Sequence, residues 1–250
     1  VNDLKGLLVS KYPILDSVIH YKKSIHASSL IGKGSVYIKD SKSLAKLFNW
    51  PLEMNYSDFD ISLNNNKNEF EVRSNRFDLT YKAFKFDKFS LVVNSSDNLN
   101  AIFTADYFLI NGVRRAGNFR CVGNLVDSIG KLSLLLFDTL NVKILSNINT
   151  NINYNKDLFS IHILNKDLFF NNSRWVINDN NYIQKSKNGL FVKNFELSDS
   201  LHFFSLRDIE GKGLVLKSDG FDISFVNQFI RNKTISFSGL FAANIEIPNY

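Results

Sequence analysis

Apolar residues recur at every second position over much of this chain. Between residues 240 and 247, Phe241, Ala243, Ile245 and Ile247 fall on one side of an extended backbone, and polar or small residues fall on the other. The same alternation runs through residues 59–63, 69–73, 77–81, 89–93 and 221–225. Because successive side chains of a strand point to opposite faces, this pattern predicts β-strands with one apolar and one polar face.

Short polar segments rich in Asn, Asp, Ser and Gly separate these predicted strands. They read "LNNNKNE", "NSSDN", "LINGV", "NDNN", "KSKNG" and "KSDG", and all of them carry residues that favour turns. Strand, turn and strand at short intervals, without long helical patterns between them, predict an antiparallel meander and not βαβ units.

Helical spacing is confined to short segments. Residues 41–49, "SKSLAKLFN", place Leu44, Leu47 and Phe48 on one helix face behind a serine cap. Residues 8–21 and 222–230 predict at most a brief helical turn each. The sequence therefore predicts an all-β fold with one or two short helices. We expect residues 1–250 to be a single elongated segment of a longer protein, with a weak subdivision into 1–164 and 165–250.

Composition and charge narrow the function only slightly. The chain has 250 residues, 44% of them hydrophobic, which is enough for a substantial core. The formal net charge of +6 permits contact with nucleic acid, but the densest basic stretch, residues 113–120, carries only Arg114, Arg115 and Arg120. A charged strand edge explains this stretch better than a nucleic-acid surface does, so no nucleic-acid partner is expected.

The residue types that carry catalysis are scattered. The four histidines are far apart in the sequence, and Cys121 is the single cysteine, so we predict no metal site. Asp58 and Asp60 share the polar side of their predicted strand, where solvation explains them better than acid–base chemistry. There is no phosphate-binding loop and no Gly-x-Ser-x-Gly sequence. We predict that the protein is not an enzyme and needs no cofactor.

The C-terminal third carries a set of softer motifs. Trp175 precedes the Asn/Asp-rich turn "NDNN", an "NF-x-L" segment follows at Asn194, and a "D-I-S-x-V-N" segment begins at Asp222, before "ISFSGLFAANIEI". In this order the motifs resemble the AsmA-like/TamB family of Gram-negative envelope proteins, in particular the Bacteroidetes type. Ala243 stands where that family has a second glycine in the final strand pair.

The resemblance implies a fold, a place and a function. The fold is a long β-sheet folded lengthwise into a curved open groove, described as taco-shaped, with an apolar concave face. The place is the periplasm, with the full-length protein anchored in the inner membrane by a segment outside this chain. The function is to shield phospholipid acyl chains during transport between the inner and outer membranes, or to support outer-membrane biogenesis with a BamA-like barrel partner.

The alternation of apolar and polar residues indicates which side chains are candidates for lipid contact. An apolar sheet face must be covered by another layer or by a guest molecule, so two sheets closed on each other are the alternative to an open groove. The matching alternative function is an extracellular β-sandwich adhesin or carbohydrate-binding module. If the groove is open, the expected lipid-contacting residues are Phe59, Ile61, Leu63, Phe77, Leu79, Tyr81, Phe221, Ile223, Phe241, Ala243, Ile245 and Ile247.

Overall fold

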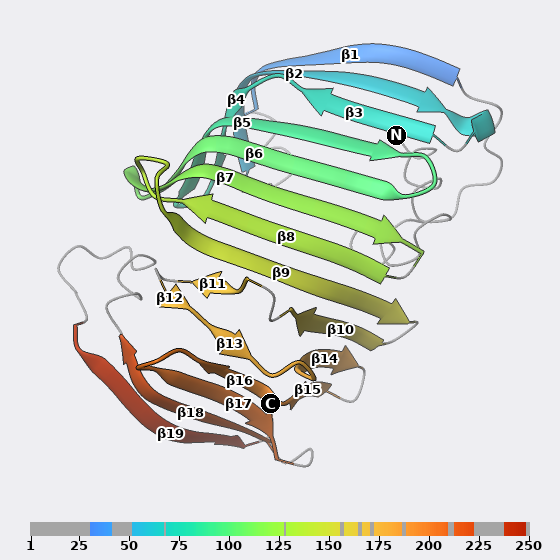
Figure 1. Ribbon diagram of the computed structural model, residues 1–250. Helices are drawn as coiled ribbons and strands as arrows, with labels where there is room; N and C mark the ends of the chain where they lie inside the picture. Colours follow the sequence, from blue (N-terminus) through green and yellow to red (C-terminus); the bar gives the residue numbers. More distant parts are fainter. Residues whose placement is uncertain are drawn as a thin grey trace. The chain divides into compact units, whose positions relative to one another are not determined.

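The computed structural model describes residues 31–41, 52–67, 69–127, 129–155, 158–164, 167–170, 173–186, 189–209, 213–222 and 238–248. Within these ranges the chain is almost entirely β-strand, and the only helix is a single 3₁₀ turn, η2 (Asn65–Lys67) (Figure 1). The neighbouring strands whose register is defined all pair antiparallel. The predicted all-β antiparallel fold is confirmed. The predicted helical segments, residues 8–21, 41–49 and 222–230, lie outside the described residues except for Ser41, which is not helical, and Asp222, which ends β18.

The chain forms two compact units, Val1–Lys131 and Leu132–Tyr250. The weak subdivision predicted from the sequence lies further along, between residues 164 and 165. Strand β8 (Ile129–Phe137) crosses from the first unit into the second.

The first unit is a meander in which the strands follow the order β1-β2-β3-β5-β6-β7, with β4 pairing both β2 and β5. The strands are β1 (Ile31–Asp40), β2 (Leu52–Asn64), β3 (Glu69–Ser74), β4 (Phe77–Tyr81), β5 (Phe84–Ser95), β6 (Leu99–Ile110) and β7 (Val113–Val126). In this unit the connections at residues 65–67, 96–98 and 111–112 fall within the predicted turn segments. At Asn111-Gly112 both residues have positive φ, 52° and 78°, as the tightest hairpin turns require.

Strands β3 and β4 together fill one position between β2 and β5. Strand β3 pairs with the C-terminal half of β2, from Phe59 to Asn64, whereas β4 pairs with its N-terminal end, from Leu52 to Asn55. The interruption between β3 and β4 therefore lies opposite the middle of β2. It marks the position of a bend that crosses the whole unit.

This bend line runs through Tyr56 in β2, Asn75 between β3 and β4, Lys88 in β5, Asp106 in β6 and Asn118 in β7. The ladder pairs lapse at these positions and resume beyond them. Three of the five residues have left-handed backbones, with φ of 49° at Tyr56, 51° at Lys88 and 42° at Asn118. Such bulge-like residues bend a strand and re-aim the side chains that follow. Figure 1 shows the strands of this unit curving toward β4.

Phenylalanine rings gather on the inner side of the bend. Phe77 lies 5.5 Å from Phe59 and 5.4 Å from Phe89, measured between ring centroids. Phe86 of β5 lies 5.0 Å from Phe119 of β7, although alternate strands of a flat sheet are about 10 Å apart. The two rings meet above the intervening β6 because the sheet curves. Phe77 and Phe89 are only 4% and 7% exposed.

Charged side chains occupy the outer side of the bend. Asp106 forms ion pairs with Arg76 (Nη1 to Oδ1, 3.4 Å) and with Lys88 (Nζ to Oδ2, 3.2 Å), and both cations are largely exposed. Exposed ion pairs contribute little to stability, so the aromatic cluster on the inner side is the main packing contribution at the bend.

The second unit contains two sheets. The first has the order β9-β10-β14-β15, with β11 paired to β9 and to β12; the second has the order β13-β16-β17-β18-β19. The strands are β9 (Ile144–Asn155), β10 (Leu158–Ile163), β11 (Phe169–Phe170), β12 (Ser173–Arg174), β13 (Val176–Ile177), β14 (Tyr182–Ser186), β15 (Gly189–Lys193), β16 (Phe195–Ser198), β17 (Phe203–Asp208), β18 (Gly213–Asp222) and β19 (Leu240–Pro248).

The two sheets of this unit share a hydrophobic core. Val192 of β15 belongs to the first sheet, Phe195 and Leu214 to the second, and all three are buried in one cluster with Trp175 and Ile177. The chain passes between the sheets at single residues, at Trp175 between β12 and β13 and at Asn194, whose φ is 50°, between β15 and β16. Two sheets closed on each other, the alternative to an open groove, therefore occur in the second unit.

One predicted turn is wrong. The segment "KSDG" lies inside β18, where the pairing to β19 shifts register between Ser218 and Phe221. Gly220 has φ +66° and lies so close to Leu201 that an added Cβ would be 2.8 Å from its carbonyl oxygen. A glycine in this conformation serves a bulge as well as a turn, which is why the sequence pattern is ambiguous here.

Candidate functional site

The inner face of the first unit is a continuous apolar surface. Directly opposed residues of antiparallel strands project to the same side, and the register aligns Ile61 with Val72, Val72 with Val93, and Val93 with Ala101. We call this surface the inner face. It comprises Met54, Phe59, Ile61, Leu63, Phe70, Val72, Phe77, Leu79, Phe86, Phe89, Leu91, Val93, Ala101, Phe103, Ala105 and Phe119.

Exposure varies along the inner face, and Phe70, at the end away from the bend, is as buried as the residues at the bend. Phe77, Phe89 and Ala105 are buried at the bend, whereas Ile61, Val93 and most of the remaining side chains are half-buried. Half-buried apolar side chains retain surface that a long apolar guest can cover, and each covered methylene stabilises the complex.

The opposite, outer face carries rows of polar residues over the same strands, with one apolar row, Val92, Ile102 and Val122, beside them. Residues Ser62, Glu71, Asn94, Asn100 and Asn124 align across β2, β3, β5, β6 and β7. Asn100 Nδ2 donates to Asn94 Oδ1 at 3.2 Å, and Asn124 Nδ2 donates to Asn100 Oδ1 at 2.6 Å. The outer face is therefore the more polar and hydrogen-bonded of the two sides, and the inner face is the more apolar.

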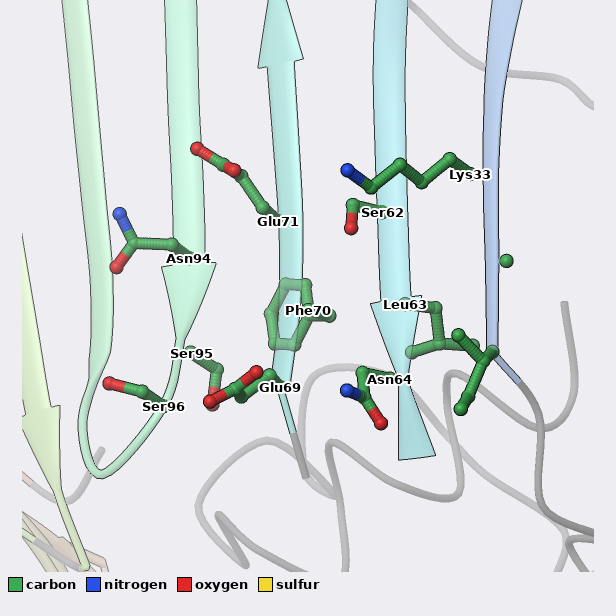
Figure 2. A pocket seen from close by; sticks show the side chains of 12 residues that line it. Lys33, Ser62, Leu63, Asn64, Glu69, Phe70, Glu71, Asn94, Ser95 and Ser96 are labelled. Carbon is green, nitrogen blue, oxygen red and sulfur yellow. The ribbon is translucent and has the colours of Figure 1, made fainter. Parts of the chain in front are cut away.

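A shallow hollow of about 480 Å³ lies near the ends of β1, β2, β3 and β5. Figure 2 shows Lys33, Ser62 and Glu71 in one row across the strands, with Leu63 and Phe70 in the next row. Its lining mixes charged, polar and apolar groups in an open setting, so it favours no single class of ligand.

The second unit has an apolar cavity. It has a volume of about 300 Å³ and is lined only by apolar side chains from both sheets and the segment between β10 and β13, namely Ile148, Ile163, Leu168, Trp175, Phe195, Leu197 and Phe204. A larger hollow of about 1010 Å³ lies on Leu168 as well, the one lining residue that the two spaces share.

The structure places the predicted lipid-contacting residues in two groups. Phe59, Ile61, Leu63, Phe77 and Leu79 come together on the inner face, and Tyr81 lies exposed at the end of β4. Phe241, Ala243, Ile245 and Ile247 lie on β19 in the second unit, where the two isoleucines are exposed. Phe221 is the last residue but one of β18, and its side chain lies outside the described residues, as does the whole of Ile223.

Several aromatic residues of the inner face are absent from the predicted set. Phe86, Phe103 and Phe119 belong to the same cluster as Phe59 and Phe77. The sequence does contain a signal for them, because the alternation in β5 changes from even positions, Phe84 and Phe86, to odd positions, Phe89 and Leu91. A change of parity inside one strand indicates a bulge, which keeps both halves of the apolar pattern on one face.

The shifted pKa values of Asp199 and Cys121 have local structural causes. Burial raises the pKa of Asp199, but hydrogen bonds from the His202 imidazole and from the backbone N–H groups of Leu201 and His202 outweigh it and lower the pKa overall. All three donors lie within three residues of Asp199, as in a loop-closing carboxylate. Burial raises the pKa of the Cys121 thiol, which lowers its reactivity.

The described residues contain no group of three or more His, Cys, Asp or Glu side chains arranged to hold a metal ion. Across the same part of the chain, no helix has the length and apolar character needed to cross a bilayer. No protein-family model, curated protein or solved structure matches the chain. The similarity to AsmA-like/TamB proteins therefore stays a prediction from sequence motifs.

Proposed function

We propose that this chain is a lipid-shielding segment, and that the inner face of its first unit covers phospholipid acyl chains. The observation that carries the proposal is the bend line, where the alternation changes parity in successive strands. This change keeps the apolar residues of both halves of the sheet on the inner side of the curve. A flat sheet with the same sequence would place half of them on the outer face.

The chemistry of the inner face suits a mobile apolar guest. Burial of an acyl chain contributes about 0.8 kcal/mol per methylene without directional bonds, so weak contacts repeated along the face hold a chain and still let it slide. The polar headgroup remains in water. Transfer of this kind requires no nucleophile, metal or cofactor.

The wider setting of the proposal rests on the resemblance to AsmA-like/TamB proteins. On that basis the chain belongs to a periplasmic protein that carries phospholipids between the inner and outer membranes or supports outer-membrane biogenesis. An inner-membrane anchor outside this chain and a BamA-like barrel partner belong to the same proposal.

A site-specific photo-crosslinking experiment tests the lipid contact. Leu91 and Val92 are consecutive half-buried residues of β5, but Leu91 pairs with Phe103 on the inner face and Val92 pairs with Ile102 on the outer face. We expect benzoylphenylalanine at position 91 to form phospholipid adducts in cells, and the same group at position 92 to form few. Equal yields at the two positions, or none at either, would refute the proposal.

A carbohydrate-binding or adhesive β-sandwich is the second candidate. The closed core of the second unit is of this architecture, and two exposed tyrosines, Tyr37 and Tyr56, lie on neighbouring strands of the first unit. Aromatic side chains exposed in this way are suited to sugar rings. Binding on a glycan array that is lost in Tyr37→Ala and Tyr56→Ala, in protein free of lipid, would favour this candidate.

A further inference from the structure

We infer that the second unit binds one single-chain anionic amphiphile of the fatty-acid type, with its tail in the cavity between the two sheets. The inference depends on the second unit alone and does not rest on the proposed role of the inner face. It begins with the cavity, which has a lining without any polar side chain.

The volume of the cavity exceeds ordinary packing defects. Protein interiors contain few voids larger than a water molecule, and an apolar cavity of about 150 Å³ is already large enough to take up benzene. This cavity has about 300 Å³. At about 30 Å³ for each water-sized group, it accommodates roughly ten carbon atoms of an alkyl chain.

The lining is built from both sheets and from the segment that connects them. Ile148 and Ile163 come from β9 and β10, whereas Phe195 and Phe204 come from β16 and β17. Trp175 is 5% exposed. A linear alkyl chain fits this setting because the lining offers contact on several sides and no hydrogen-bonding partner for a polar ligand.

The larger hollow supplies the site for the headgroup. Lys143 and Arg174 line it. Backbone hydrogen bonds, that of Val142 first, and the charge of Lys143 lower the pKa of Asp138, but among the described residues neither cation forms a direct ion pair with a carboxylate. Asp138 also lines it, but its Oδ1 accepts the Val142 N–H at 2.7 Å. Asp167 is the second carboxylate in the lining. The two cations are therefore available to a carboxylate or phosphate at the end of the alkyl chain.

Quenching of Trp175 fluorescence is a direct test. Trp50 is the other tryptophan of the chain, so the Trp50→Phe protein reports from Trp175 alone. We expect dodecanoate brominated at its terminal carbon to quench Trp175 saturably with one ligand per chain. An absence of quenching at saturating ligand, or quenching that rises without saturation, would overturn the inference.

Chain length tests the cavity in the same protein. Each added methylene that enters the cavity should tighten binding about fourfold, up to about ten carbons, after which the dissociation constant should level off. An affinity independent of chain length, or one that keeps rising well beyond this length, would contradict a bounded cavity.

The headgroup site is tested with matched ligands. Lys143→Gln and Arg174→Gln should each weaken dodecanoate binding up to about fivefold and leave dodecanol binding unchanged. Tighter binding of dodecyltrimethylammonium than of dodecanoate would overturn the assignment of an anion. Leu91→Ala on the inner face of the first unit is the control and should leave Trp175 quenching unchanged, so failure of this inference and failure of the proposed function are distinguishable.

A comparison of vesicles with free fatty acid distinguishes the two possible sources of the ligand. Quenching by vesicles of phosphatidylglycerol with brominated acyl chains would identify a bilayer lipid, and quenching by free brominated dodecanoate alone would identify a free fatty acid. Both results support the site, whereas quenching by neither would overturn it.

Discussion

Truncation of Phe89 to alanine should strongly destabilise the first unit. The Phe89 ring is 7% exposed and lies 5.4 Å from Phe77, 5.9 Å from Phe86 and 6.0 Å from Phe103, between ring centroids. Removing a buried phenyl ring costs about 3–5 kcal/mol through lost burial and the cavity that remains. Because three aromatic partners lose contact at once, we expect the upper half of that range, about 4 kcal/mol.

Urea denaturation followed by far-UV circular dichroism measures this change. With a slope of about 2 kcal/mol per molar urea, the midpoint of the transition of the first unit should fall by about 2 M. Tyr37→Ala is the matched control, because Tyr37 is an aromatic residue that is 60% exposed, and it should change the free energy of unfolding by about 0.5 kcal/mol or less. If Phe89→Ala costs no more than Tyr37→Ala, the aromatic cluster is not the core of the bend, and the argument for a curved inner face fails.

Three further predictions concern the second unit. Gly220→Ala should cost about 1–3 kcal/mol in thermal unfolding, because φ is +66° and the new Cβ would approach the Leu201 carbonyl to 2.8 Å. Asn181→Ala should cost about 2–3 kcal/mol in urea, because its buried amide accepts from the Ile163 N–H at 2.9 Å and donates to the Ile163 carbonyl at 2.7 Å. Asp199→Asn should be less stable than the wild type above about pH 4. That difference should shrink as the pH falls through the lowered folded-state pKa of Asp199, since the unfolded state binds the proton first; a difference that is constant from pH 7 to pH 2 would contradict the hydrogen-bonding role.

Much of the strand content follows from the sequence because alternation is a local property. The segments with Phe59, Phe70, Phe77 and Phe89 all become strands, and the Asn-rich segments between them become turns or a 3₁₀ turn. In a strand with one solvent-exposed face, apolar and polar residues must alternate. Each strand can therefore be predicted from its own residues, without knowledge of the strands it pairs with.

The bend and the two-sheet core are harder to predict because they depend on single residues. The bend arises at residues such as Lys88 and Asn118, whose side chains do not require a left-handed backbone. The chain changes sheet at single residues, Trp175 between β12 and β13 and Asn194 between β15 and β16, without the cluster of turn residues that usually separates strands. Tertiary packing selects these conformations. The alternation in a short segment predicts the strands on the two sides of a bend or a change of sheet separately, and does not predict how the two are joined.

The bend line also determines the dimensions of the trough that the inner face of the first unit forms where the sheet curves. In β5 it leaves four residues on one side, Phe84 to Asp87, and six on the other, Ser90 to Ser95, which correspond to walls of about 13 Å and 20 Å. Since the bend recurs at the same register in successive strands, wall height depends on strand length alone. The length of the trough depends on the number of strands, so each added hairpin would extend it by about 10 Å and raise its capacity in proportion without altering its cross-section.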